Sequence, residues 1–231
     1  MTLEEKLASY KPPARAVELI KSTKVVFMVG VSAAGKDAAR TKLLKTGKYH
    51  HIVSHTTRKP RANHGVMEQD GHDYHFIDLK TAERMVDNHA FVEAKYFSDN
   101  IYGTSIAELQ LAHDEGKIAL TDIEVQGVVE YKNIEESVIP IFLLPPDYNT
   151  WQKRLEGRYI GQSDPEDIKK RMLTAQKELQ EALEKPYFEY VVNEDLDKTV
   201  KIIDEIAHGN FSSKKNDQAR EVARKLLEKL A

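Results

Sequence analysis

The chain has 231 residues, a formal net charge of −3 and no cysteine, which gives length for one domain with a small appendage and excludes disulfide and thiol chemistry. Because the net charge is slightly negative, no global basic field draws the chain to nucleic acid or membranes, and any anion site has to be local. No apolar run approaches the ~20 residues of a membrane span. The acidic, amphipathic start is not a signal peptide, so we expect a soluble cytoplasmic protein.

Short helical pieces around Pro12-Pro13 predict an N-terminal extension over residues 1–23. From residue 24 to residue 207, apolar runs that suit strands alternate with helical spacing. The expected strands cover 25–29, 51–54, 118–123, 138–144 and 190–192. The expected helices cover 38–44, 105–115, 148–158, 165–183 and 196–206. This alternation predicts an α/β fold in which helices flank a mostly parallel sheet, with ligands bound beyond the carboxyl ends of the strands.

Two stretches interrupt the alternation, and one follows it. Aromatic, strand-like fragments around a helix predict an inserted lobe over about 55–103. A polar, glycine-containing segment between helices that carry arginines predicts a mobile lid over about 156–170. In the tail, 208–231, apolar residues three or four apart predict an amphipathic helix. This helix either packs on its own domain or forms a dimer contact, so monomer and homodimer both stay open.

The first functional pattern is Gly30-Val31-Ser32-Ala33-Ala34-Gly35-Lys36-Asp37, between the run 25–29 and a helical stretch. A strand, a glycine loop and a helix in succession turn backbone N–H groups and the positive helix end toward one point. Lys36 adds a mobile cation. This is the phosphate-binding P-loop pattern, G-x-x-x-x-G-K, so we expect these eight residues to bind ATP.

The residue after Lys36 departs from the strict pattern, in which a Ser or Thr hydroxyl holds Mg²⁺. Two interpretations of Asp37 stay open: a carboxylate ligand of Mg²⁺, or a first-turn acidic residue that suits the helix dipole. Asp122 ends the apolar run 118–121, where a carboxylate would face nucleotide and metal. We therefore predict Asp37 and Asp122 as magnesium ligands.

A second pattern, Ser54-His55-Thr56-Thr57-Arg58-Lys59-Pro60-Arg61, follows an expected strand with hydroxyls and then arginines three apart. Guanidinium forks bind phosphate oxygens at two points, although a solvated basic turn has the same composition. Histidines 50, 51, 55, 64, 72 and 75 lack the paired spacing of metal ligands, and we expect them to be solvated loop residues.

Further segments follow in order: Asp73-Tyr74, Phe91-x-Glu93, Ile101-Tyr102-Gly103-Thr104, Asp122-Ile123-Glu124-x-Gln126-Gly127, Arg154-Leu155-x-x-Arg158, Lys170-Arg171 and Val192-Asn193-x-Asp195. Together with the two patterns above, this ordered set resembles the guanylate kinase family from about residue 25 to residue 206. Both terminal extensions lie outside the resemblance. A twelve-residue link between Arg61 and Tyr74, 62–73, is longer than the family usually has.

The resemblance implies that the inserted lobe binds GMP. It assigns the GMP phosphate to Arg58, Arg61, Tyr74 and Tyr102, and the region of the base to Ser54, Glu93, Thr104 and Glu124, where Glu124 replaces the family's usual Asp. A carboxylate at Glu93 accepts two N–H groups on the guanine edge, and Ser54 donates to its O6. A wrong base leaves such groups unpaired at ~1–3 kcal/mol each.

The resemblance also implies which residues carry catalysis. Lys36, Arg61, Arg158, Arg171 and Mg²⁺ would supply positive charge to the transferring phosphoryl group, and Arg154 and Asn193 would join the ATP site. We therefore expect ATP-dependent phosphorylation of GMP, and leave open whether dGMP is also an acceptor. Two alternatives stay open here: a P-loop kinase of a ribose bisphosphate or deoxynucleotide, since related sugar-phosphate kinases carry Gly-Lys-Asp, and a non-catalytic module that binds protein partners.

Overall fold

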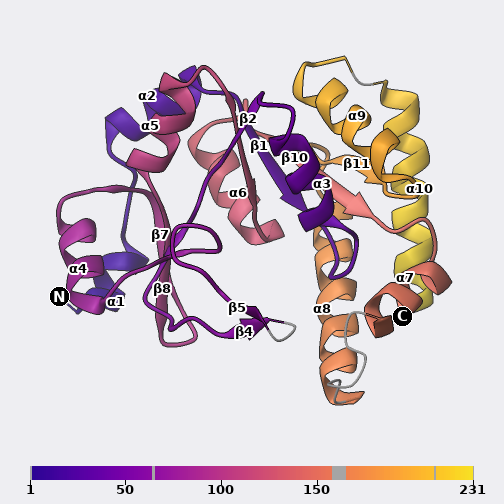
Figure 1. The fold of residues 1–231 in the computed structure, drawn as a ribbon, viewed down its shortest axis with the longest axis horizontal. Helices are drawn as coiled ribbons and strands as arrows, with labels where there is room; N and C mark the ends of the chain where they lie inside the picture. Colours follow the sequence, from indigo (N-terminus) through magenta and orange to yellow (C-terminus); the bar gives the residue numbers. More distant parts are fainter. Residues whose placement is uncertain (1, 64–65, 158–164, 211, 231) are drawn as a thin grey trace. The chain divides into compact units, whose positions relative to one another are not determined.

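The computed structural model describes residues 2–63, 66–157, 165–210 and 212–230. Five strands form its largest sheet: β1 Val25–Val29, β2 Tyr49–His51, β9 Ile118–Asp122, β10 Ile139–Leu144 and β11 Glu189–Val192. Their order is β11-β10-β1-β9-β2, and Figure 1 labels these strands except β9. The pairs β1–β10, β10–β11 and β2–β9 are parallel, so the prediction of an α/β fold with a mostly parallel sheet is confirmed.

The composition of the central strands explains their position in the sheet. All five residues of β1 and the last five of β10 are buried. Strands of a parallel sheet are covered on both faces, so they are apolar at successive positions rather than at alternate ones. The runs 25–29 and 138–144 have this composition, and the strands observed there lie within one residue of the predicted bounds.

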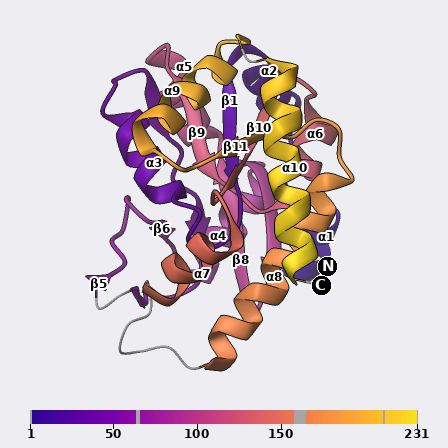
Figure 2. The same ribbon diagram turned by 90° about the vertical axis from the view of Figure 1, so that its right-hand side faces the viewer.

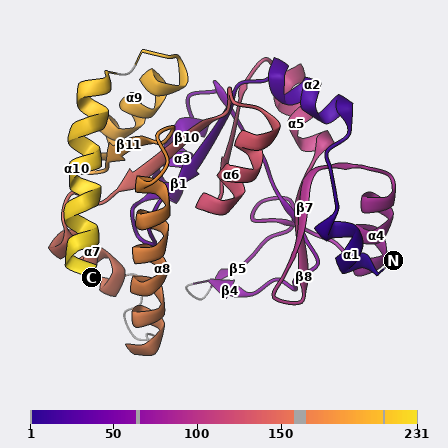
Figure 3. The same cartoon turned by 180° about the vertical axis from the view of Figure 1, so that it is seen from behind.

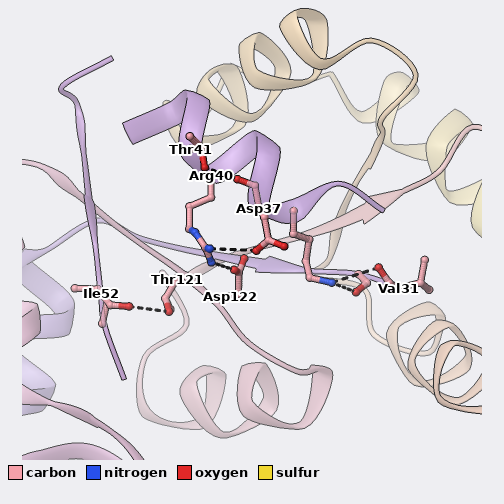
Figure 4. Close-up of polar contacts among 9 residues, drawn as sticks. Val31, Asp37, Arg40, Thr41, Ile52, Thr121 and Asp122 are labelled. Atoms are coloured by element: carbon pink, nitrogen blue, oxygen red, sulfur yellow. Dashed lines mark hydrogen bonds and ion pairs between the residues drawn. The ribbon is translucent and has the colours of Figure 1, made fainter. Parts of the chain in front are cut away.

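The predicted strand over 51–54 is wrong in its bounds, because β2 covers Tyr49–His51. One further backbone bond joins the N–H of Ile52 to the carbonyl of Leu120 at 3.0 Å. The hydroxyl of Thr121 then donates to the carbonyl of Ile52 at 3.2 Å (Figure 4). At Ile52 a side-chain hydrogen bond therefore replaces the backbone hydrogen bonds between β2 and β9, and β2 ends before the apolar residues Ile52 and Val53.

The chain divides into two compact units, which are described separately. The first comprises residues 1–25, 49–121 and 134–137, and the second comprises residues 26–48, 122–133 and 138–231. Within the described residues, no helix combines the length and the apolar composition that crossing a bilayer requires.

Most of the second unit's described helices were expected from their apolar spacing. They are α3 Lys36–Leu44, α6 Val125–Ile134, α7 Tyr148–Gly157, α8 Pro165–Leu183, α9 Leu196–Ala207 and α10 Ser213–Leu230. The bounds of α3, α7, α8 and α9 differ from the predicted ones by two residues or fewer, α10 begins five residues after the start of the predicted tail, and α6 was not expected. Side-chain capping fixes some of these ends, as at α9, where the carboxylate of Asp195 accepts from the N–H of Lys198 at 2.9 Å.

Helix α6 was not predicted, and its sequence explains why. Val125, Val128 and a central glycine disfavour helix in isolation. Tertiary contacts override that preference, because Val125, Gly127, Val128 and Tyr131 are all buried. A Cβ at Gly127 would lie 2.5 Å from the side chain of Ile123, so the glycine lets the helix approach the chain that precedes it.

The tail helix α10 packs on α8, β10 and β11 of its own unit, beside which it runs in Figure 2. The side chain of Asn216 accepts from the N–H of Tyr190 at 2.7 Å and so pairs the outer edge of β11. Arg220 donates to the carbonyls of Leu183 and Lys185, at 2.5 and 3.4 Å, at the carboxyl end of α8. The tail is therefore an integral part of the second unit.

The first unit contains a second sheet in the order β6-β3-β8-β7, built from β3 His55–Thr56, β6 His75–Phe76, β7 Phe91–Phe97 and β8 Asn100–Ser105. Strands β7 and β8 are antiparallel and are joined through Ser98 and Asp99, both with positive φ. That conformation is typical of tight hairpin turns of type I′.

Four helices of this unit are α1 Leu3–Ala8, α2 Ala14–Ser22, α4 Leu79–Asp87 and α5 Ile106–Asp114. Helices α1 and α4 pack against β7, beside which they lie in Figure 3, and a core of Leu7, Val86, Phe91 and Ile101 joins them. The hydroxyl of Tyr10 donates to the carbonyl of Phe91 at 2.9 Å. The N-terminal helices thus complete the packing of this unit.

The long link after Arg61 folds back on itself as a hairpin of β4 Ala62–Asn63 and β5 Val66–Met67. The N–H of Glu68 donates to the carbonyl of Arg61 at 3.1 Å, which closes the base of the hairpin. The extra residues of the link therefore form a hairpin that brings Glu68 back beside Arg61.

Candidate active site

The phosphate-binding pattern forms a loop between β1 and α3, as predicted. Gly30 has φ 142°, and a Cβ there would lie 2.2 Å from the carbonyl oxygen of Leu143. Gly35 has φ 97°, and a Cβ there would lie 2.3 Å from Nδ2 of Asn193. Both positions combine a left-handed backbone with a close approach, so only glycine fits without strain.

Lys36 is the first residue of α3, and its ammonium group donates to the carbonyls of Gly30 and Val31, the latter at 3.3 Å. The lysine therefore lies along its own loop. Beside it is a cavity of about 280 Å³ lined by residues 33–38 and Arg154. A cavity at a helix N-terminus, between a lysine and an arginine, suits a polyphosphate.

Two polar side chains hold the loop from behind. The amide of Asn193, which is buried, donates to the carbonyl of Ala34 at 2.8 Å. The indole of Trp151 donates to the carbonyl of Ser32 at 2.7 Å. Asn193 was predicted at the ATP site, and the structure places it as a support of the loop backbone. Trp151 was not predicted as part of the site; the one feature of the sequence that could have drawn attention to it is that it is the single tryptophan of the chain.

Of the arginines expected around the transferring phosphoryl group, Arg171 on α8 lies with its guanidinium 3.5 Å from the hydroxyl of Ser32. Arg154 lines the cavity and donates to the carbonyl of Asn193 at 3.1 Å. Residues 158–164 of the expected lid, Arg158 among them, lie outside the described residues, and 165–170 form the first turns of α8. Farther along α8, burial raises the pKa of Glu178 to about 7, against the opposing charge of Lys36.

The two predicted metal ligands share one guanidinium. Arg40, on α3, donates to Oδ2 of Asp122 through one nitrogen and to Oδ1 of Asp37, at 3.1 Å, through the other (Figure 4). Burial raises the pKa of the Asp122 carboxyl; Arg40 and Lys36 oppose that rise and Asp37 adds to it. The sequence analysis missed Arg40, although its spacing of three from Asp37 was a signal.

The residues present fit a magnesium ion. Both carboxylates offer the hard oxygen ligands that Mg²⁺ prefers. In addition, Oδ1 of Asp122 is buried and has no hydrogen-bond partner within the described part of the chain. Such an unsatisfied acceptor is a position where a cation would be stabilised.

In the first unit, a carboxylate that the sequence analysis missed organises the two predicted arginines. Glu68, only 8% exposed, accepts from both terminal nitrogens of Arg58, at 2.8 and 2.9 Å. It also accepts from the backbone N–H of Arg61 at 3.0 Å, while the Arg61 side chain stays 72% exposed. Although burial alone would raise the pKa of Glu68, bonds from Arg58 and Arg61 lower it.

The two predicted tyrosines, Tyr74 and Tyr102, lie beside the Glu68–Arg58 pair. The guanidinium carbon of Arg58 lies 5.3 Å from the ring centre of Tyr74, and the rings of Tyr74 and Tyr102 are 6.1 Å apart, edge to face. Burial raises the pKa of Tyr74, so its hydroxyl stays protonated and able to donate. The structure therefore brings Arg58, Arg61, Tyr74 and Tyr102 into one cluster.

Three of the four residues expected near the base, Ser54, Glu93 and Thr104, lie in or beside the same sheet, and the fourth, Glu124, does not. The carboxylate of Glu93 accepts from the N–H of Thr104, its neighbour across β7 and β8, at 3.1 Å. Ser54 precedes β3, and its carbonyl accepts from the N–H of His75 at 2.9 Å. Glu124 belongs to the second unit, where it is exposed just before α6.

The expectation of solvated loop histidines is met only by His72, which is exposed; His50, His51, His55 and His75 are half-buried in strands β2, β3 and β6, and His64 lies outside the described residues. His55 departs furthest from the expectation. Its ring lies 4.6 Å from that of His75, centre to centre, and its Nδ1 is buried without a hydrogen-bond partner in the described chain. Burial, reinforced by His75, lowers the pKa of His55 to about 4, so the ring is neutral at pH 7. His75 in turn contacts the carboxylate of Glu108 at 2.9 Å.

A glycine loop between a parallel strand and a helix, with a lysine at the helix start and a cavity beside it, defines a P-loop kinase. The fold agrees, because the crystal structure of guanylate kinase from Anaplasma phagocytophilum superposes with a TM-score of 0.57 over 83% of this chain and 88% of that one, at 24% identity.

Sequence comparison gives the family. The guanylate kinase profile matches residues 22–209. A guanylate kinase of Thermus thermophilus is 37% identical over 169 residues, 73% of each chain. The Schizosaccharomyces pombe enzyme is 37% identical over 79% of this chain and 89% of its own, and the Sus scrofa enzyme 32% over 77% and 88%. The chain therefore belongs to the guanylate kinase family.

Proposed function

We propose that this chain transfers the γ-phosphoryl group of ATP to GMP, and to dGMP, with the predicted residues in the roles given below. Membership of the family supplies the reaction class, a nucleoside monophosphate kinase of purine metabolism. The observation that carries the proposal for this chain is the intact phosphate loop, in which Lys36 stands at the helix N-terminus beside an open cavity.

On the ATP side, the loop N–H groups and the positive end of α3 hold the β- and γ-phosphates. Lys36 leaves its loop carbonyls to follow the phosphate that is transferred. Arg171 adds charge from α8, and Arg158 is assigned the same task from the family pattern alone. Such a reaction needs in-line positioning and positive charge on the equatorial oxygens more than covalent help.

On the GMP side, Glu68 holds the Arg58 fork and the Arg61 backbone in place before substrate arrives. The exposed Arg61 side chain and the hydroxyls of Tyr74 and Tyr102 then meet the monophosphate. Glu93, oriented by the N–H of Thr104, accepts from the guanine edge, and Ser54 donates to the guanine O6; Glu124 of the second unit is assigned to GMP from the family pattern alone.

Asp37 and Asp122 are the residues that would hold Mg²⁺, which when bound screens the charge of the ATP phosphates. We further propose a cytoplasmic enzyme whose partners are its small-molecule substrates, with no nucleic-acid or membrane partner. The cysteine-free composition supports a reducing compartment. Whether it acts as a monomer or homodimer is read from its solution mass.

A substrate-panel assay of ADP release tests the proposal. We expect Mg²⁺-dependent turnover with GMP, weaker turnover with dGMP, and little with AMP, CMP, UMP or a ribose bisphosphate. Lys36→Met is the matched control, since it removes the cation and keeps the length of the side chain. Absence of GMP turnover by the folded wild-type protein, or faster turnover with a non-guanine acceptor, would contradict the proposal.

A further inference from the structure

The guanidinium of Arg40 is built into the pair of carboxylates assigned to the metal. One nitrogen contacts Asp37 at 3.1 Å and the other contacts Asp122, so a single fork joins the helix start to the end of β9 (Figure 4). The Arg40 side chain is only 20% exposed. The Asp122 carboxylate is 25% exposed, so the Arg40–Asp122 half of the bridge is partly buried, whereas Asp37 is 63% exposed and pairs with Arg40 as its i,i+3 neighbour on α3.

The contacts of Arg40 offset the repulsion between the negative charges of Asp37 and Asp122. Asp37 stands where a neutral hydroxyl is usual after the P-loop lysine. It brings a second negative charge next to Asp122, and two close carboxylates disfavour each other's charged forms. Arg40 supplies the compensating charge to both groups at once, on the same turn of α3 as Asp37.

The same bridge competes with a cation for the carboxylates. The acceptor of Asp122 that Arg40 leaves unused, Oδ1, is buried without a hydrogen-bond donor among the described residues. A divalent ion attracted there meets the guanidinium charge a few ångströms away. Even with water-like screening, that repulsion between a double and a single charge weakens binding by about tenfold.

We propose that Arg40 is a positioning residue of the metal site: it clamps Asp37 and Asp122 together in the nucleotide-free enzyme and keeps their affinity for a divalent cation low. The inference rests on the proposed function in assigning the metal to these carboxylates. Because the phosphates of ATP add negative charge at the same place, the metal enters with the nucleotide rather than ahead of it.

The test measures Mn²⁺ binding to the nucleotide-free protein by electron paramagnetic resonance, without any turnover. We expect Arg40→Leu to tighten Mn²⁺ binding by about tenfold. We expect Arg40→Lys to tighten it less, since an ammonium group keeps the charge but meets one carboxylate as a point. Arg224→Leu is the matched control, because Arg224 pairs with an acidic residue three positions away on exposed α10.

Thermal melting in EDTA gives a second readout. Arg40→Leu leaves two carboxylates without their common partner, so we expect a lower melting temperature in EDTA and a larger rise on adding Mn²⁺ than wild type shows. In Asp37→Ser, Arg40 still contacts Asp122 and still repels an ion at its Oδ1, so adding Arg40→Leu should again tighten Mn²⁺ binding by about tenfold.

Unchanged or weaker Mn²⁺ binding by Arg40→Leu would overturn the proposal. If that variant does not fold, Arg40→Lys decides: affinity equal to wild type overturns it, and a gain supports it. These outcomes are independent of the acceptor, so a failure of GMP turnover in the substrate panel would leave the Mn²⁺ result interpretable.

Discussion

Glu68→Gln is the sharpest test of how the proposed GMP site is organised. The glutamate accepts two bonds from Arg58 and one from the N–H of Arg61 while being 8% exposed. The glutamine side chain has the same shape as glutamate but no charge. Its NH₂ group also replaces an acceptor oxygen, so it would face an N–H donor of Arg58 or Arg61. Charge-assisted bonds contribute ~1.5–3 kcal/mol, and breaking a buried pair costs ~3–5 kcal/mol. Because the Arg58–Glu68 bonds are partly buried and the amide keeps some of them, we expect the free energy of unfolding to fall by ~2 kcal/mol.

The same substitution should raise KM for GMP by about 10–100-fold and leave KM for ATP within about twofold, because the phosphate fork loses its preset orientation. Urea unfolding and a coupled ADP-release assay measure the two effects. Glu221→Gln on α10, whose ion pair with Arg224 is exposed, is the control and should change neither. The reasoning is refuted if KM for GMP and the unfolding free energy both match those of this control.

The pH dependence of this effect has a defined sign. The pKa of Glu68 is lowered in the folded state. Its contribution to stability is therefore fully present above the ordinary carboxyl pKa and is lost as pH falls through the folded value. The difference between wild type and Glu68→Gln should accordingly shrink in acid.

Three further outcomes are expected. Lys36→Met should lower kcat by about 10³-fold or more, with unfolding in urea nearly unchanged; an activity loss under about tenfold would contradict the role given to the lysine. Gly35→Ala should lower the free energy of unfolding by ~2 kcal/mol or more, whereas Gly47→Ala, with φ 75° but open space, should cost ~1 kcal/mol; equal losses would refute the argument from close approach. His55, with a pKa of about 4 against 6.5 when unfolded, should make the protein ~2 kcal/mol less stable at about pH 4.5 than at about pH 7, and His55→Phe should remove that part of the pH dependence in urea titrations.

The parts of the fold that follow from local pattern were predictable. β1 is apolar at every position, α8 repeats its apolar residues at helical spacing, and both were found at the predicted bounds. Helix α6 was not predictable, because its valines and Gly127 disfavour helix until Ile123 and the core pack on it. Local propensity fails where tertiary burial decides.

The site divides in the same way. The glycine loop and Lys36 are contiguous in sequence, so their geometry follows from one strand, one turn and one helix. Arg40, Glu68 and Trp151 act through partners that lie far along the chain or beyond an unexpected hairpin. Sequence spacing predicts the groups that we propose meet substrate, whereas the residues that support them could be found only from their three-dimensional neighbours.

The grip of Arg220 on the carbonyls of Leu183 and Lys185 has a mechanical consequence for Arg171. These bonds attach the C-terminal end of the nineteen-residue helix α8 to the tail, and Arg171 lies nearer the N-terminal end of that helix. Truncating the chain before Arg220 would therefore remove an anchor of α8 while leaving unchanged every residue that we propose contacts phosphate.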